Sequence, residues 1–110
     1  MKKIIINWEE TLTLCNRNEA LAKELLLMLK TDLPRQKQIL LDAFERNDTQ
    51  MMRDIVHQIL GSCSYISLPH IKESAEAMHK AIHDKKATVP AAKDTLINAM
   101  NEVIMSPLIK

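Results

Sequence analysis

The sequence predicts an all-α fold, an antiparallel up-down four-helix bundle with a short N-terminal helix. The chain has one glycine and four prolines in 110 residues, so few residues suit the tight turns of β-hairpins. Its strings of Leu, Ala, Lys, Glu and Met are strong helix formers. One Trp, one Tyr and one Phe against seven Met leave mainly aliphatic side chains to fill a core between helices.

Length and charge indicate one domain over residues 1–110, with protein partners. The formal net charge of +1 removes the electrostatic case for binding nucleic acid or an anionic membrane. Two cysteines, Cys15 and Cys63, are too few for a disulfide framework and suit a reducing compartment. The charged and apolar opening, residues 1–6, is too short for a signal sequence or a membrane span. We therefore expect a cytoplasmic, monomeric protein without membrane contact.

The first predicted helix is short. Asn7, followed by Glu10, resembles a capping box that opens a helix ending near Cys15. Leu12 and Cys15 lie on one side of this helix. The run Asn-Arg-Asn at residues 16–18 then breaks it.

A long second helix is expected from Glu19 to about Arg46. Apolar residues recur along it in a rough helical period, at Leu21, Leu25, Met28, Leu29, Leu33, Ile39, Leu40, Ala43 and Phe44. Pro34 should kink or divide this helix, because proline lacks the amide hydrogen that the helix needs. The apolar run 25–29 is broader than one bundle face requires. Part of it is expected to cover the short helix or to stay exposed for a partner.

Three further helices complete the bundle. Asn47-Asp48 supplies the cap of the third helix, whose apolar stripe is Met52, Ile55, Val56, Ile59, Cys63 and Ile66. The fourth begins at 67–69 and ends at 85–88, with its stripe at Leu68, Ile71, Ala75, Met78 and Ile82. The last opens at 88–90 and ends at 106–107, with its stripe at Ala92, Leu96, Met100 and Val103. Short connections place successive helices antiparallel.

The residues that carry chemistry stand in the third helix, in the segment His-Gln-Ile-Leu-Gly-Ser at 57–62. With each residue advancing about 100°, His57 falls about 150° from the apolar stripe and Gly61 nearly opposite it, so both should face solvent. A glycine within a helix costs roughly 1 kcal/mol relative to alanine. Gly61 adds no bulk beside His57, so another protein can approach the imidazole closely. A neutral imidazole, whose ordinary pKa is about 6.5, is a nucleophile that could take a phosphoryl group.

These features resemble the histidine-containing phosphotransfer (HPt) domain of two-component phosphorelays, found at the C-termini of hybrid sensor histidine kinases and in stand-alone relay proteins. The resemblance covers about residues 5–83. It is carried by Ile6-Asn7-Trp8, Asp32-Leu33-Pro34, Ala43, Asp48 and, most strongly, His57-x-x-x-Gly61-Ser62. It implies that His57 is the phosphoacceptor and that Gly61 gives clearance for a receiver domain.

The resemblance also implies a function. The chain would accept a phosphoryl group from a receiver aspartate and pass it to another response-regulator receiver, its partners being receivers of response regulators or of a hybrid kinase. It would be a phosphocarrier without ATP binding or turnover. No cofactor of its own is expected, because the sequence has no nucleotide-binding motif and no acidic cluster for magnesium. The magnesium site is expected in the receiver.

The chain departs from the family pattern His-x-Leu-Lys-Gly, because Leu60 stands where the family has a lysine near the phosphoryl oxygens. Leu60 is expected to give a docking partner an apolar contact. Arg53, one turn before His57, is the candidate replacement charge, and Gln58 and Ser64 are candidate hydrogen-bond donors. Two further departures, Ser67 for a family glycine and Met78-His79 for a frequent Leu-Glu pair, touch packing and surface.

Two alternatives remain open: a degenerate HPt-like adaptor that binds receivers without being phosphorylated, and a purely structural bundle. A metal site is a third interpretation, because His79 and His83 lie one turn apart on one helical face. Two ligands are too few for such a site, so a solvated helix face is favoured and no metal is expected.

Overall fold

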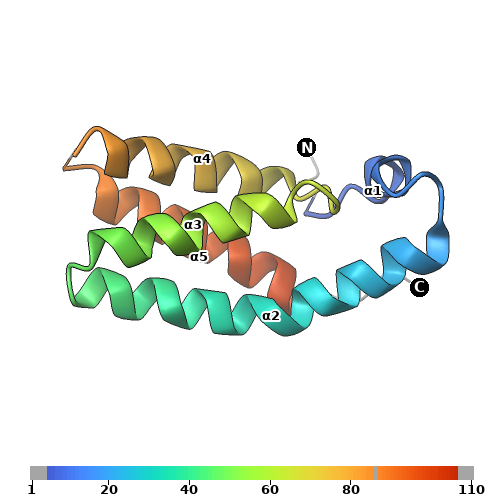
Figure 1. Ribbon diagram of the computed structural model, residues 1–110, viewed down its shortest axis with the longest axis horizontal. Coiled ribbons are helices and arrows are strands. Elements are labelled where there is room, and N and C mark those ends of the chain that lie inside the picture. Colours follow the sequence, from blue (N-terminus) through green and yellow to red (C-terminus); the bar gives the residue numbers. More distant parts are fainter. Residues whose placement is uncertain (1–4, 86, 107–110) are drawn as a thin grey trace.

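The computed structural model describes residues 5–85 and 87–106, and within them it contains five helices and no strand. The helices are α1 (Trp8–Leu14), α2 (Glu19–Glu45), α3 (Thr49–Ser62), α4 (Pro69–His83) and α5 (Val89–Met105). Each of the four longer helices packs against two others, in the ring α2, α3, α4, α5 and back to α2. Consecutive helices of the ring run antiparallel, and α1 lies beyond one end of it (Figure 1). The predicted all-α bundle with a short N-terminal helix is confirmed.

Three helices begin at side-chain caps, because the first backbone amides of a helix have no partner within it. The side-chain oxygens of Asn7, Asn18 and Asp48 each accept a hydrogen bond from a backbone amide three residues later, at 3.0–3.1 Å. A proline lies in the first turn of both α4 and α5, where its missing amide hydrogen costs nothing. These caps account for the helix starts that the sequence predicts.

Helix α1 is attached to the loop between α3 and α4 through Ser67. The Asn7 amide donates to the Ser67 carbonyl at 2.9 Å, and the Ser67 amide donates to Thr11 Oγ1 at 2.9 Å. The Ser67 hydroxyl donates to Glu10 Oε1 at 2.6 Å. The Glu10 carboxylate therefore bonds to the loop, and the capping box predicted at Asn7 has only its Asn7 half.

Helix α2 is continuous, so Pro34 does not divide it; the helix bends part-way along its length (Figure 1). Its N-terminal part runs past the other long helices toward α1 (Figure 1). Leu21 and Met28, predicted on the core face, are 41% and 59% exposed, and Leu26, which was not predicted, is 1% exposed. The prediction was wrong there because this part of α2 lies outside the ring of four helices.

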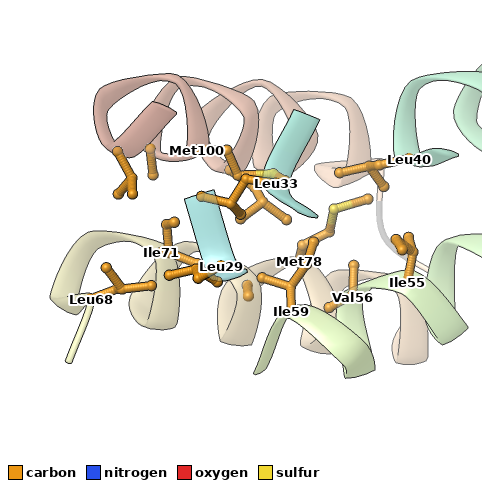
Figure 2. Close-up of a cluster of buried hydrophobic side chains, with 14 of the residues drawn as sticks. Leu29, Leu33, Leu40, Ile55, Val56, Ile59, Leu68, Ile71, Met78 and Met100 are labelled. Atoms are coloured by element: carbon orange, nitrogen blue, oxygen red, sulfur yellow. The ribbon is translucent and has the colours of Figure 1, made fainter. Parts of the chain in front are cut away.

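The core lies inside the ring and receives side chains from all four long helices. Figure 2 labels ten of the buried side chains of the core, Leu29, Leu33, Leu40, Ile55, Val56, Ile59, Leu68, Ile71, Met78 and Met100. Every apolar position predicted for α4 is buried. Helix α3 ends at Ser62, so Cys63 and Ile66, predicted within it, lie in the turn that follows. A smaller cluster of Leu12, Cys15 and Ala22 joins α1 to α2.

Several sequence predictions fall outside the described residues, namely those on the opening residues 1–4, on Lys86 and on Pro107. Within residues 5–85 and 87–106, no helix combines the length and the apolar character needed to cross a bilayer.

Candidate functional site

His57 stands on the outer face of α3. The buried residues of this helix, Met52, Ile55, Val56 and Ile59, point into the core. His57 and Gly61 are both exposed, one turn apart on the opposite face. The predicted exposure of both residues is therefore confirmed, and their roles stay predictions.

Gly61 is not required by the packing of this chain. A Cβ atom built on Gly61 meets nothing within 4 Å, and its backbone does not have the positive φ that favours glycine. A helical glycine nevertheless costs roughly 1 kcal/mol relative to alanine. Packing within the described residues therefore does not explain why a glycine stands here despite this cost. The open space over Gly61 is accessible to another molecule.

A second histidine lies beside His57. His79 of α4 is half-buried, and its ring centroid lies 6.3 Å from that of His57, with 45° between the ring planes. The sequence predicts a solvated helix face for His79 and gives no indication of this pair. The short connection predicts that α3 and α4 run antiparallel, but the relative axial position that pairs these two rings depends on how the helices pack.

Leu60 and Arg53 occupy the flank of α3 beside His57. Leu60 is half-buried and packs against the main core, so it is less available to a partner than an exposed leucine would be. Arg53 is exposed, and its Nη1 donates to Gln50 Oε1 at 3.4 Å. The Arg53 guanidinium therefore reaches toward the start of α3, the direction in which helical side chains lean, and away from His57.

The two predicted hydrogen-bond donors are exposed but are not held at His57. Gln58 neighbours His57 on α3, and its backbone carbonyl accepts from the Ser62 hydroxyl at 3.3 Å. Ser64 lies beyond the end of α3, in a turn where its amide donates to the Gly61 carbonyl at 3.1 Å. Its predicted place on the His57 face assumed a longer helix, so the structure gives Ser64 no link to His57.

An apolar groove opens between α2 and the end of α3. This α2–α3 groove has a volume of about 690 Å³ and is lined by Leu25, Leu27, Met28, Leu29, Thr31, Asp32, Ser62, Tyr65 and Ile66. Leu27, Met28 and Tyr65 are 53%, 59% and 58% exposed. The run 25–29 was expected to cover the short helix or to stay exposed. Leu27 and Met28 are exposed, whereas Leu25 packs against α1. The groove begins at Ser62, the residue after Gly61.

The titratable groups around the site are not arranged for metal binding or for thiol chemistry. Burial raises the pKa of the Cys63 thiol to about 11, with Lys72 lowering it and Glu76 raising it by smaller amounts. Cys63 therefore stays protonated near pH 7 and is a poor nucleophile. No group of three or more His, Cys, Asp or Glu side chains within the described part of the chain could hold a metal ion. The pair His79 and His83 has no third ligand there.

Comparison with known proteins gives two matches. The sequence model of the Hpt domain matches residues 24–104, a span that leaves out α1 and takes in most of α5. The fold is similar to the crystal structure of the HPT domain from the Hpt sensor hybrid histidine kinase of Shewanella. The TM-score is 0.84 and the sequence identity 24%, over 91% of this chain and 87% of that one. No curated protein gives a significant match. Because the family match spans most of the chain and includes the whole of α3, this chain belongs to the Hpt domain family.

Proposed function

We propose that this chain is a phosphorelay intermediate that carries a phosphoryl group on His57 from one receiver domain to another. Hpt domains are phosphocarriers of two-component signalling and interact with receiver domains. The observation that carries the assignment to His57 is its exposure in the middle of α3, one turn from a glycine whose Cβ position is open. An imidazole on a rigid helix with free space beside it is suited to in-line attack.

The proposed transfer is a single displacement at phosphorus. The lone pair of a neutral His57 ring nitrogen forms the N–P bond while the P–O bond to the receiver aspartate breaks, and the aspartate leaves as a carboxylate with the electron pair. The proton on the second ring nitrogen then passes to water. In the reverse direction that nitrogen first takes a proton back from water, and the aspartate of a second receiver then displaces the neutral imidazole from phosphorus.

The partner supplies what this chain lacks in the proposal. The receiver contributes the aspartyl phosphate and the magnesium ion that neutralises the phosphoryl oxygens, so the carrier needs no cofactor and no ATP. Both encounters belong to the cytoplasm, where receiver domains meet their partners, and one copy of the chain suffices for each.

The α2–α3 groove is the proposed docking surface for the receiver. It lies close to the transfer site along α3, since Ser62, which lines the groove, directly follows Gly61. Leu27, Met28 and Tyr65 leave apolar side chains exposed at its rim. A receiver that reaches His57 over Gly61 would cover this apolar surface, and burial of such surface stabilises a complex.

Met28→Glu tests the docking surface. We expect at least about tenfold weaker binding of the receiver, because the substitution removes a buried apolar contact and adds a charge that must be desolvated. The fold should be unaffected, since Met28 is 59% exposed. Titration calorimetry with an unphosphorylated receiver measures the change.

Met105→Glu is the matched control. Met105 is 83% exposed on α5, and its neighbour Ser106 accepts a hydrogen bond from Lys30, which lies on the side of α2 away from Met28. Receiver affinity equal to that of the wild type is expected for this variant. Equal weakening by both substitutions would rule out the groove as the docking surface.

The experiment that tests the proposed function is phosphate transfer from a panel of phosphorylated receiver domains. We expect an acid-labile, base-stable label on the chain, since a phosphoramidate bond is hydrolysed in acid, and peptide mapping should place the phosphate on His57. A label on any other residue would show that the assignment to His57 is wrong. Receiver binding without label would favour the adaptor.

The second candidate function is the adaptor. Leu60 favours it, because this position, one turn from His57, carries no cation. Under the relay proposal, Leu60→Lys adds a charge near the phosphoryl oxygens and should speed transfer about threefold to tenfold. Leu60→Met, which is similar in size and neutral, should leave the rate unchanged. Rapid-quench measurements with one receiver compare the three proteins. A label that appears only in Leu60→Lys would establish the adaptor.

A further inference from the structure

We propose that His79 is a positioning residue for the phosphoryl group on His57, and that its charge makes phosphate retention depend on pH. The proposal rests on the proposed phosphorylation of His57. In it, the His79 imidazolium donates a hydrogen bond to a phosphoryl oxygen and holds the group in one orientation beside α4.

The placement of the two rings carries the proposal. Their centroids are 6.3 Å apart, and the rings are tilted by 45°, so they are not stacked on one another. At this centroid separation, a phosphoryl group on one ring is within reach of the other ring. His79 is half-buried, which restricts its rotamers, while His57 is exposed and open to a partner. A fixed donor beside a mobile acceptor reduces the conformational entropy lost when the contact forms.

Leu60 strengthens the case because it fills the flank of α3 that faces α4. This flank is identified by Cys63, one turn after Leu60, which experiences the charges of Lys72 and Glu76 on α4. On that flank Leu60 packs against the core and supplies no charge. The Arg53 guanidinium on this flank reaches toward Gln50, so in the proposal the cation for the phosphoryl group comes from α4, where His79 is the residue in ring contact with His57.

The other charged groups on α3 are engaged away from the pair. Arg53 donates to Gln50 Oε1 at 3.4 Å. Asp54 accepts from Gln50 Nε2 at 2.8 Å. Both contacts lie toward the N-terminal end of α3, so the α3 side of His79 is occupied by His57 and Leu60.

On α4 itself, the charged neighbours on the His79 side are Lys72, Glu76, Lys80 and His83, and the Nδ1 atom of His83 lies 3.2 Å from the Asp84 carboxylate. The flank of α4 opposite His79 faces α5, where His70 meets Glu102 at 3.0 Å. Helix α2 packs on α3 and α5 and not on α4. Among these charged and titratable groups, His57 is therefore the one on a neighbouring helix that contacts His79.

The pH dependence follows from imidazole chemistry. Imidazole is the side chain that gains a positive charge as pH falls from about 8 to 5. An imidazolium near the phosphoryl dianion stabilises the phosphorylated chain, and that stabilisation disappears as the imidazolium loses its proton. Retention of phosphate should therefore be favoured at the acidic end of this range and lost toward the alkaline end.

The test compares wild type, His79→Gln and His79→Lys. Each is equilibrated with one phosphorylated receiver between about pH 6 and pH 8.5, and the share of phosphate on the chain is measured. We expect the wild type to retain about threefold to tenfold more than His79→Gln at pH 6, with this ratio falling to about one at pH 8.5. His79→Lys should keep the advantage across the whole range, because an ammonium stays charged throughout it.

Taking ratios at each pH removes the effect of pH on the receiver and on His57, which all variants share. His70→Gln is the control, because it also removes an imidazole from α4, but on the opposite flank, and should leave the ratio at one. Circular dichroism melts verify that each variant is folded.

Equal retention by wild type and His79→Gln at every pH, with label present, would overturn the role of His79 alone. An absence of label on the wild type at every pH would overturn the proposed function and this proposal together.

Discussion

The variant His57→Gln is expected to accept no phosphoryl group from any receiver that phosphorylates the wild type. Glutamine keeps a polar side chain of similar length but has no nucleophilic ring nitrogen, so the N–P bond cannot form. His57 is exposed and contributes nothing to the core, so the free energy of unfolding should change by less than about 0.5 kcal/mol. Phosphate incorporation measures the first result and urea denaturation the second.

His83→Gln provides the control for His57→Gln. The His83 side chain is 81% exposed near the end of α4, so its removal also deletes a surface imidazole from a helix. Incorporation of phosphate at the wild-type level is expected for this control. If His57→Gln still carried an acid-labile label, the phosphoacceptor would be another histidine, and the proposed site would be wrong.

Gly61→Glu is expected to abolish transfer while the bundle stays folded or gains stability. No atom lies within 4 Å of a Cβ on Gly61, so the new side chain extends into the space above His57 that a receiver would occupy in the proposed transfer. Its negative charge also repels the aspartyl phosphate. Glycine is the poorest helix former after proline, so the free energy of unfolding should rise, by up to about 1 kcal/mol for Gly61→Ala. Transfer rates and urea denaturation of the two variants separate clearance from stability.

Ala77→Glu is the matched control for the glutamate. Ala77 is an exposed position of α4, on the side of that helix away from His79, so the variant adds the same charge without entering the space over His57. Its transfer rate should equal that of the wild type. A Gly61→Glu variant that transfers at the wild-type rate would show that the open space over this glycine has no part in docking.

The sequence predicted the fold because local signals and the global pattern agree. Side-chain caps at Asn7 and Asp48 and the prolines of α4 and α5 lie where the helices begin. The end of α3 was placed too late, because Cys63 and Ile66 continue the apolar period after the backbone has left the helix. Periodicity reports which side chains are buried, and a buried turn residue satisfies it as well as a helical one.

The core face of the first part of α2 could not be predicted from its own sequence. Residues 25–29 are all apolar, so every direction around the helix is equally favourable there. The choice is made by contacts with distant residues: Ala22 is buried in the cluster with Leu12 and Cys15 of α1, and Leu26 is buried in the main core. Those contacts leave Met28 exposed.

The candidate site was predictable as far as a single helix determines it. His57 and Gly61 share a face of α3, and spacing along one helix is enough to show this. The ring contact between His57 and His79 depends on how far α3 and α4 slide past one another, which is set by the packing of their buried faces. The turn that takes Ser64 away from His57 depends on where α3 ends, which the sequence placed wrongly.

The closed ring of helices also has a consequence for biosynthesis. Three of the four helix–helix interfaces in the ring join helices that follow one another in the chain. The fourth joins α2 to α5, the first and last helices of the ring. Chains emerge from the ribosome N-terminus first, so the apolar face of α2, including Leu33, is synthesised well before Met100, a member of the same cluster (Figure 2). Until α5 has emerged, the apolar faces of α2, α3 and α4 lack one of the helices that cover them, and exposed apolar surface of this kind favours aggregation.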